Sequence, residues 1–425
     1  MTRVDCLKRG IQLISALQRI NESGQREILV TDFSDTLQGK DTSKVVDLMT
    51  DKHGRACFRV KYNVKSIDPL AGKVYQEEYF DCATHTAEEI EAHVRMQEFD
   101  FPLWYKHHPS FEMGRINDFN VPFIVQVAGC NFHDGGPTDG CRFCFVDQGS
   151  NDGKPGAGKA WLSAEDCLDA FLMARERLRQ HYLQETGFDL NLRVLRISGG
   201  EPTLVLPWIV DLWHLIESRG LDREIVCQVD TNLSTLSDDF LRSMDMSFSG
   251  AVGLGFLHSL EHQWFKSFEE NLRILAGYGV KFLAGMKGCD SANVASNTQS
   301  NQTLMAQLQS LRRLVDFGLD VYPQMYNPNP ATLSLFLEFV DNFLLRNFSK
   351  RLHIGPLKLY GPNRERLMRE AEELHIERQR YVVGQEMQWQ QAFQASEIVM
   401  DEYLQSRYRC SYKRTTRSDV ALLLR

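Results

Sequence analysis

Cys130, Cys141 and Cys144 lie in one short stretch of the chain, at the end of the apolar run VPFIVQVAGC and in the CRFC that follows. Thiolates are soft ligands that suit iron and zinc. Three of them on a loop after a strand could bind three corners of a four-iron cluster and leave the fourth iron open to an outside ligand. The alternatives are a zinc site, in which His133 or Asp134 would supply the fourth ligand, and unrelated buried thiols.

A second group follows about fifty residues later, where the strand-like run LRVLRIS leads into Gly199, Gly200, Glu201 and Pro202. Paired glycines at the end of a parallel strand let the backbone approach a ligand closely. A carboxylate beside them can receive a protonated amine. Taken alone this segment could be an ordinary turn, but after the three cysteines it indicates a binding site.

The apolar run ending in cysteines, with an aromatic residue before the last of them, and the strand ending in GGEP together resemble the radical S-adenosylmethionine (SAM) superfamily. The resemblance covers about residues 121–330. It implies that Cys130, Cys141 and Cys144 hold a 4Fe-4S cluster, that SAM occupies the open iron, and that one electron cleaves SAM to a 5'-deoxyadenosyl radical. The family's usual spacing is CxxxCxxC, whereas the ten residues NFHDGGPTDG separate Cys130 from Cys141 here; known members carry insertions at this place.

The resemblance also implies a set of SAM-binding residues in the cysteine loop and at two strand ends. These are Phe143 near the adenine, Gly199, Gly200 and Glu201 at the amino group, and Gln228, Asp230 and Asn232 in CQVDTNLS, where the family often has an ETNG-like stretch. Alternate residues of a strand share a face, so the last three should point the same way. For Asn232 an Asx turn before the next helix is the alternative.

Three further residues are candidates for substrate contact or catalysis because each follows a strand-like run: His258, Lys287 and Tyr326. In αβ barrels the reactive residues gather at the carboxyl ends of the strands. For each of them the alternative is an ordinary structural or solvated side chain.

Short apolar runs alternate with helical segments from residue 121 onward, at 121–129, 192–200, 224–232, 250–258, 280–288 and 319–327, and 351–361 could add one more strand. This βαβ pattern predicts a parallel sheet. Together with the resemblance it predicts an α/β fold: a partial (β/α)6 barrel at 119–362, an α+β flank at 1–118 and a helical extension at 363–425. Ser163 with Asp166 predicts a helix start, and Gly220 and Gly279 predict helix ends.

The composition is that of a globular protein, with 425 residues, 43% of them hydrophobic, and a net charge of −8. This charge argues against a broad nucleic-acid surface, although it leaves room for a local basic patch. The N-terminus does not resemble a signal peptide, and no run approaches the ~20 apolar residues of a membrane span. Ten unevenly spaced cysteines indicate reduced thiols and a cytoplasmic protein.

The main hypothesis is therefore a radical SAM enzyme that abstracts hydrogen from a small-molecule or nucleoside-type substrate. It would need an electron donor such as flavodoxin or ferredoxin. One alternative is an activase that installs a radical on a partner protein, and another is a zinc-binding module without catalytic activity.

Overall fold

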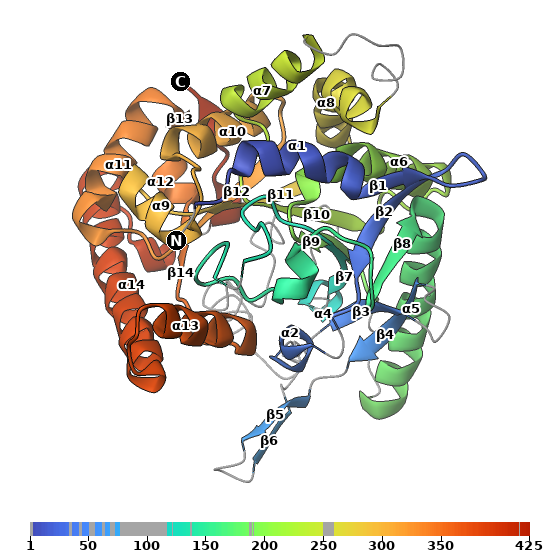
Figure 1. The fold of residues 1–425 in the computed structure, drawn as a ribbon, viewed down its shortest axis with the longest axis horizontal. Helices are drawn as coiled ribbons and strands as arrows, with labels where there is room; N and C mark the ends of the chain where they lie inside the picture. The colour runs from blue at the N-terminus through green and yellow to red at the C-terminus, as the bar shows by residue number, and fades with distance from the viewer. Residues whose placement is uncertain are drawn as a thin grey trace.

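The structure is a computed structural model of the chain. It describes residues 3–33, 36–41, 45–50, 56–61, 64–68, 73–76, 117–120, 122–136, 138–186, 189, 191–249, 259–415 and 417–425. The fold is mixed α/β, with a mostly parallel central sheet and many helices around it (Figure 1).

Parallel strands form the centre of the sheet and lie side by side in chain order. They are β7 (Pro122–Val127), β9 (Val194–Gly199), β10 (Val226–Thr231), β11 (Lys281–Met286), β12 (Asp320–Tyr326) and β14 (His353–Gly355). The predicted parallel sheet is thus confirmed. The predicted strand 250–258 lies outside the described residues, and β10 pairs directly with β11, where Gln228 opposes Lys281.

Helices follow the strands and cover the outer side of the sheet (Figure 1). They are α5 (Ala164–Thr186), α6 (Leu206–Ser218), α7 (Asp238–Ser249), α8 (Leu260–Gly277), α9 (Ser291–Thr298), α10 (Leu304–Asp316) and α11 (Pro330–Phe343). The predicted start of α5 is confirmed, because Ser163 Oγ accepts a hydrogen bond from the Asp166 N–H (3.0 Å) and donates one to its carboxylate (2.7 Å). Gly220 and Gly279 follow α6 and α8 with φ of 69° and 70°, the left-handed conformation that ends a helix.

The N-terminal segment extends the same sheet. It comprises α1 (Cys6–Ala16), β1 (Gln18–Ile20), β2 (Arg26–Thr31), α2 (Leu37–Asp41), β3 (Val45–Thr50), β4 (Ala56–Lys61), the pair β5 (Val64–Asp68) and β6 (Lys73–Gln76), and α4 (Asn117–Asn120). Strand β3 pairs with β7 in parallel. Strand β2 lies between β1 and β8 (Lys159–Ser163), antiparallel to both. The division at residue 118 stays a prediction.

The C-terminal part is helical, as the sequence predicts from 363 onward. It contains β13 (Leu345–Arg346), α12 (Phe348–Arg351), α13 (Gly361–Glu373), the long α14 (Arg378–Tyr408) and β15 (Leu423–Leu424), which pairs with β13. Figure 1 shows α13 beside the loop that follows β7. Among the helices of the described residues, none is both long and apolar enough to cross a membrane.

Candidate functional site

The loop after β7 carries the three cysteines and is folded by its own backbone. The N–H groups of Gly129 and Cys130 donate to the carbonyls of Ser150 (2.9 Å) and Asn151 (3.0 Å). The N–H of Cys144 donates to the carbonyl of Cys141 (2.9 Å), so these two cysteines sit on one tight turn. The loop is therefore held at its beginning, its turn and its end.

The three thiols share one environment. Burial raises the pKa of Cys130, and the nearby thiols of Cys141 and Cys144 raise it further. Burial also raises the pKa of Cys141, which the ammonium of Lys287 opposes. Yet no three His, Cys, Asp or Glu side chains of the described residues are grouped closely enough to hold a metal ion. The three cysteines are neighbours, and their role as cluster ligands stays a prediction.

The glycines after β9 bring this strand end against the start of the cysteine loop. Gly199 has a φ of +102°, which favours glycine. A Cβ on Gly200 would overlap the carbonyl group of Gly129. The N–H of Glu201 donates to this same carbonyl (3.0 Å). The paired glycines thus serve the close approach of two backbone segments within the protein itself.

Glu201 is fully buried at the end of β9, and protein donors surround its carboxylate. Oε1 accepts hydrogen bonds from the N–H and hydroxyl of Thr203 and from the hydroxyl of Thr231 (2.8 Å). Oε2 accepts one from the N–H of Asn232 (2.6 Å). Burial raises the pKa of Glu201, and these hydrogen bonds oppose that effect. The carboxylate links the ends of β9 and β10; its predicted contact with an amine is untested.

Gln228, Asp230 and Asn232 lie along β10 and just beyond it. Asp230 Oδ1 accepts from the Gln228 amide (2.8 Å), and Asp230 Oδ2 pairs with Arg196 of β9 (2.7 Å). The Asn232 Oδ1 accepts from the N–H of Ser234 (3.0 Å), which is the Asx turn considered as the alternative. Its Nδ2 also lies 3.8 Å from the Cys130 sulfur. Asn232 therefore joins the turn to the cysteine loop.

Phe143, Lys287 and Tyr326 come together although they lie far apart in sequence. The rings of Phe143 and Tyr326 are 5.8 Å apart between centroids. The ammonium of Lys287 lies 5.7 Å from the centroid of the Phe143 ring. Two of the three predicted catalytic candidates thus contact the cysteine loop. The third, His258, lies outside the described residues.

Helix α13 contacts the same loop, which sequence reasoning did not predict. Arg142, between two of the cysteines, donates from Nε (3.1 Å) and Nη2 (3.0 Å) to one carboxylate oxygen of Glu370. Arg366 donates to the carbonyl of Cys141, and Thr138 to the carboxylate of Glu373 (3.2 Å). These partners lie over 200 residues apart, so no local pattern could have found them.

Arg196 is the other residue that sequence reasoning missed. It is the lone charged residue within the apolar strand VLRIS, and a charge at such a position was the available signal.

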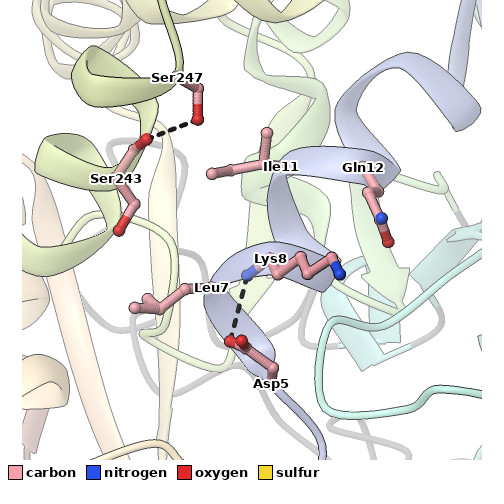
Figure 2. Close-up of a pocket in the computed structure, with 7 residues that line it drawn as sticks. All are labelled: Asp5, Leu7, Lys8, Ile11, Gln12, Ser243 and Ser247. Atoms are coloured by element: carbon pink, nitrogen blue, oxygen red, sulfur yellow. Dashed lines mark hydrogen bonds between the residues drawn. The ribbon is translucent and has the colours of Figure 1, made fainter. Parts of the chain in front are cut away.

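A separate hollow of about 310 Å³ lies between α1 and α7 (Figure 2). It is lined by Asp5, Leu7, Lys8, Ile11, Gln12, Ser243 and Ser247. The Ser247 hydroxyl donates to the backbone carbonyl of Ser243 (2.8 Å). None of the predicted site residues lines this hollow.

No protein-family model matches the sequence, and no curated protein is similar to it. Two similar solved structures are those of the cobalamin-dependent S-adenosylmethionine radical enzyme OxsB. The form with aqua-cobalamin is 12% identical, with 72% of this chain and 33% of that chain covered and a TM-score of 0.35. The form with aqua-cobalamin and S-adenosylmethionine is 11% identical, with 79% of this chain and 36% of that chain covered and a TM-score of 0.34. The chain spans about a third of the length of these proteins, and a likeness at this level says nothing of what it binds or does.

Proposed function

We propose that this chain is a radical SAM enzyme. In this proposal Cys130, Cys141 and Cys144 hold a 4Fe-4S cluster, and SAM binds between the cysteine loop and the ends of β9 and β10. An electron donor such as flavodoxin or ferredoxin reduces the enzyme. The substrate is a small molecule or a nucleoside.

One observation carries the proposal: three neighbouring thiols at the end of β7 meet the glycine turn at the end of β9. The contact between Gly129 and Gly200 joins the two segments on which the family resemblance rests. Its support is the chemistry of the donors: three soft thiols lie on one loop, with Phe132 and Phe143 packed beside them, although the described side chains are not grouped closely enough to hold a metal as they stand. Other folds place Cys-x-x-Cys pairs on turns, but such pairs do not call for a glycine turn on the next strand.

We also infer that β7, β9, β10, β11, β12 and β14 form a partial (β/α)6 barrel. Their order in the sheet is their order in the chain, and helices cover their outer side. The carboxyl ends of parallel strands lie at one edge, which is where barrel enzymes place their reactive groups. The cysteine loop, Glu201, Asn232, Lys287 and Tyr326 all follow or end such strands.

Reductive cleavage of SAM to a 5'-deoxyadenosyl radical is the chemistry that such a cluster supplies when bound. The chain's own residues would hold the cluster and SAM and keep water away from them. Lys287 places a positive charge beside the thiol of Cys141, which favours its thiolate. The rings of Phe143 and Tyr326 shield this side of the loop from water. Glu201 holds the ends of β9 and β10 at a set separation through its hydrogen bonds.

The test is anaerobic reconstitution with iron and sulfide, followed by reduction with dithionite and chromatography for 5'-deoxyadenosine. We expect a brown protein that forms this product, and loss of the product in Cys144→Ala. Cys410→Ala is the matched control, because Cys410 lies after α14, away from the three neighbouring thiols.

Undiminished cleavage in Cys144→Ala would remove Cys144 from the ligand set. A colourless protein that binds zinc in place of iron would favour the zinc module. Product that appears only when a second protein is present would favour the activase.

A further inference from the structure

The inner face of the parallel sheet, opposite the helices, is polar. Every second residue along a strand, such as Leu195 and Ile197 of β9 and Val229 of β10, packs into the helix-covered core. The residues between them point to the opposite face of the sheet. Those that carry polar side chains on the middle of this face are Gln126, Arg196, Ser198, Gln228, Asp230, Gln324 and Tyr326. Leu283, which opposes Asp230 on β11, also lies on this face, but its immediate neighbours there are charged and polar. Such a surface does not serve as a hydrophobic core, so another role is required.

The centre of this face is the ion pair between Arg196 and Asp230. Nε and Nη2 of Arg196 both reach Asp230 Oδ2, at 2.8 and 2.7 Å. The hydroxyl of Ser198 donates to the same oxygen (2.7 Å), and the amide of Gln228 donates to Oδ1 (2.8 Å). Asp230 therefore accepts as many hydrogen bonds as a carboxylate ordinarily takes. It fixes the position of Arg196, and the pair has no net charge.

Solvent reaches this pair, because the side chains of Arg196 and Asp230 are 29% and 19% exposed. A guanidinium that is held on one side and open on the other is preorganised to donate to an oxygen acceptor. Since Asp230 balances its charge, the acceptor that suits it best is a carbonyl. An anionic ligand at this place would lose its hydration, and the charge of Arg196 is already neutralised by Asp230.

Gln126 supplies an independent observation. Its side chain is 1% exposed, and it opposes Ser198 on the neighbouring strand. Its Oε1 accepts from the amide of Gln38 (2.6 Å), but its Nε2 has no hydrogen-bond acceptor within the described part of the chain. A buried donor without an acceptor is destabilising, because it has lost its hydrogen bond to water and gained none in the protein. A ligand that presents an oxygen here would remove this cost.

The polar face is continuous with the cysteine loop through Tyr326. Its ring contacts Phe143, and its hydroxyl lies within electrostatic reach of both Arg196 and Asp230. The ammonium of Lys287 lies over Phe143 and near the Cys141 thiol, and a Cβ on Gly285 would meet its Nζ at 3.1 Å. Lys287 therefore marks the boundary between the polar face and the thiols. A molecule bound to the polar face would thus lie next to the proposed SAM site.

We propose that the polar face around Arg196 and Asp230 binds an uncharged, planar molecule with carbonyl and N–H groups, such as a nucleobase or an unphosphorylated nucleoside. This rests on the proposed function and names its substrate class. The glutamine amides and the tyrosine hydroxyl offer both donors and acceptors, which match the alternating groups on a base edge. At Arg196 the balanced charge disfavours a phosphate, and the ammonium of Lys287 offers a counter-charge only at the end of this face next to the cysteine loop.

The test measures binding to the full-length chain, as purified and without SAM, by isothermal titration calorimetry. The probes are guanosine, cytidine and uridine, and their 5'-monophosphates; adenosine is left out because it is part of SAM and would also report the proposed SAM site. We expect saturable binding of at least one nucleoside and at least tenfold weaker binding of its monophosphate. Gln126→Leu and, as a second variant, Asp230→Asn should each weaken binding at least tenfold. Arg179→Gln is the control, because its pair with Asp189 is exposed.

Three results would overturn the assignment: no nucleoside binds, the monophosphates bind as tightly as the nucleosides, or folded variants bind like wild type. Thermal melts of each variant establish that it is folded. SAM cleavage is measured separately on reconstituted samples. Nucleoside binding without SAM cleavage would support this site and contradict the proposed radical chemistry. SAM cleavage without nucleoside binding would support the radical chemistry and contradict this site.

Discussion

Gly200 allows two backbone segments of the site to come into contact. It lies where the end of β9 crosses the start of the cysteine loop, and a side chain there would overlap the backbone of Gly129. The same Gly129 carbonyl accepts the hydrogen bond from Glu201. Because backbone cannot move aside as a flexible side chain can, the crossing requires glycine.

Gly200→Ala should therefore destabilise the protein by about 2–4 kcal/mol, the range of severe core substitutions, because the two segments must separate and lose this hydrogen bond. Urea unfolding followed by circular dichroism measures the change. Gly156→Ala is the matched control, since a Cβ there meets open space. Equal stability of the two variants would mean that the strand ends can part at little cost.

At this scale the sequence predicted which residues gather but not which groups they contact. Gly199, Glu201, Asn232, Lys287 and Tyr326 were placed at strand ends from the βαβ pattern, and the described structure puts them there. Two of the four donors around Glu201, on Thr231 and Asn232, depend on the register between β9 and β10, which a single sequence does not reveal. For the same reason the pairing of Arg196 with Asp230 was missed.

At the scale of elements, α13 acts on the cysteine loop from outside the sheet. Its residues Arg366, Glu370 and Glu373 lie on one face, at the three- and four-residue spacing of a helix, and each contacts the loop. The bonds between Arg142 and Glu370 are charge-assisted, and both side chains are largely buried. Such bonds contribute about 1.5–3 kcal/mol each. The helix holds the turn that carries Cys141 and Cys144.

Glu370→Ala should loosen this turn in the metal-free protein. We expect its thiols to react about tenfold faster with a thiol reagent, since the loss of about 1.4 kcal/mol raises the open population tenfold. Mass spectrometry of the labelled peptide 138–148 measures the rate. Glu372→Ala on the same helix is the control, because Glu372 pairs with Arg378 at the exposed surface. Equal rates in both variants would contradict a holding role for α13.

The sequence predicted that the segment after 363 is helical, and this is confirmed. It could not predict where α13 lies. Helix periodicity tells which residues share a face, but the surface that this face covers is set by the whole chain. The described residues of the N-terminal segment show the same limit: their strands were indicated, yet their pairing with β7 and β8 was not.

At the scale of the whole molecule, Arg351 ties the sheet to the C-terminal segment. Its guanidinium, which is almost fully buried, pairs with Asp320 at the start of β12. It also donates to the carbonyls of Val321 (2.9 Å) and Val420. Lys281 adds a second cation beside Asp320, at 2.9 Å. The carboxylate of β12 thus balances two cations, one from α12 and one from β11.

Asp320→Asn should lower the free energy of unfolding by about 2 kcal/mol at pH 7, somewhat less than for a wholly buried pair because Asp320 is partly exposed. Burial alone would raise the pKa of Asp320, but Arg351 and Lys281 hold it below its ordinary value of 3.8. Since the folded state binds this proton less readily, the stabilisation is present above that pH and is lost as pH falls through the lower folded pKa.

The difference between wild type and Asp320→Asn should therefore shrink in urea titrations as pH falls from 7 toward about 3. Asp189→Asn, at the exposed pair with Arg179, is the control and should change stability by less than about 0.5 kcal/mol. A difference that stays constant with pH would show that Asp320 contributes through its shape and not its charge.

The bond between Arg142 and Glu370 also sets an order of events during synthesis. The partners are separated by 228 positions, and chains emerge from the ribosome with the N-terminal end first. While the first three hundred residues are being made, the cysteine turn has no α13 to rest on. The turn reaches its final shape only when that helix has been translated and has docked. A ligand that needs the docked turn could then bind only after α13 has been made.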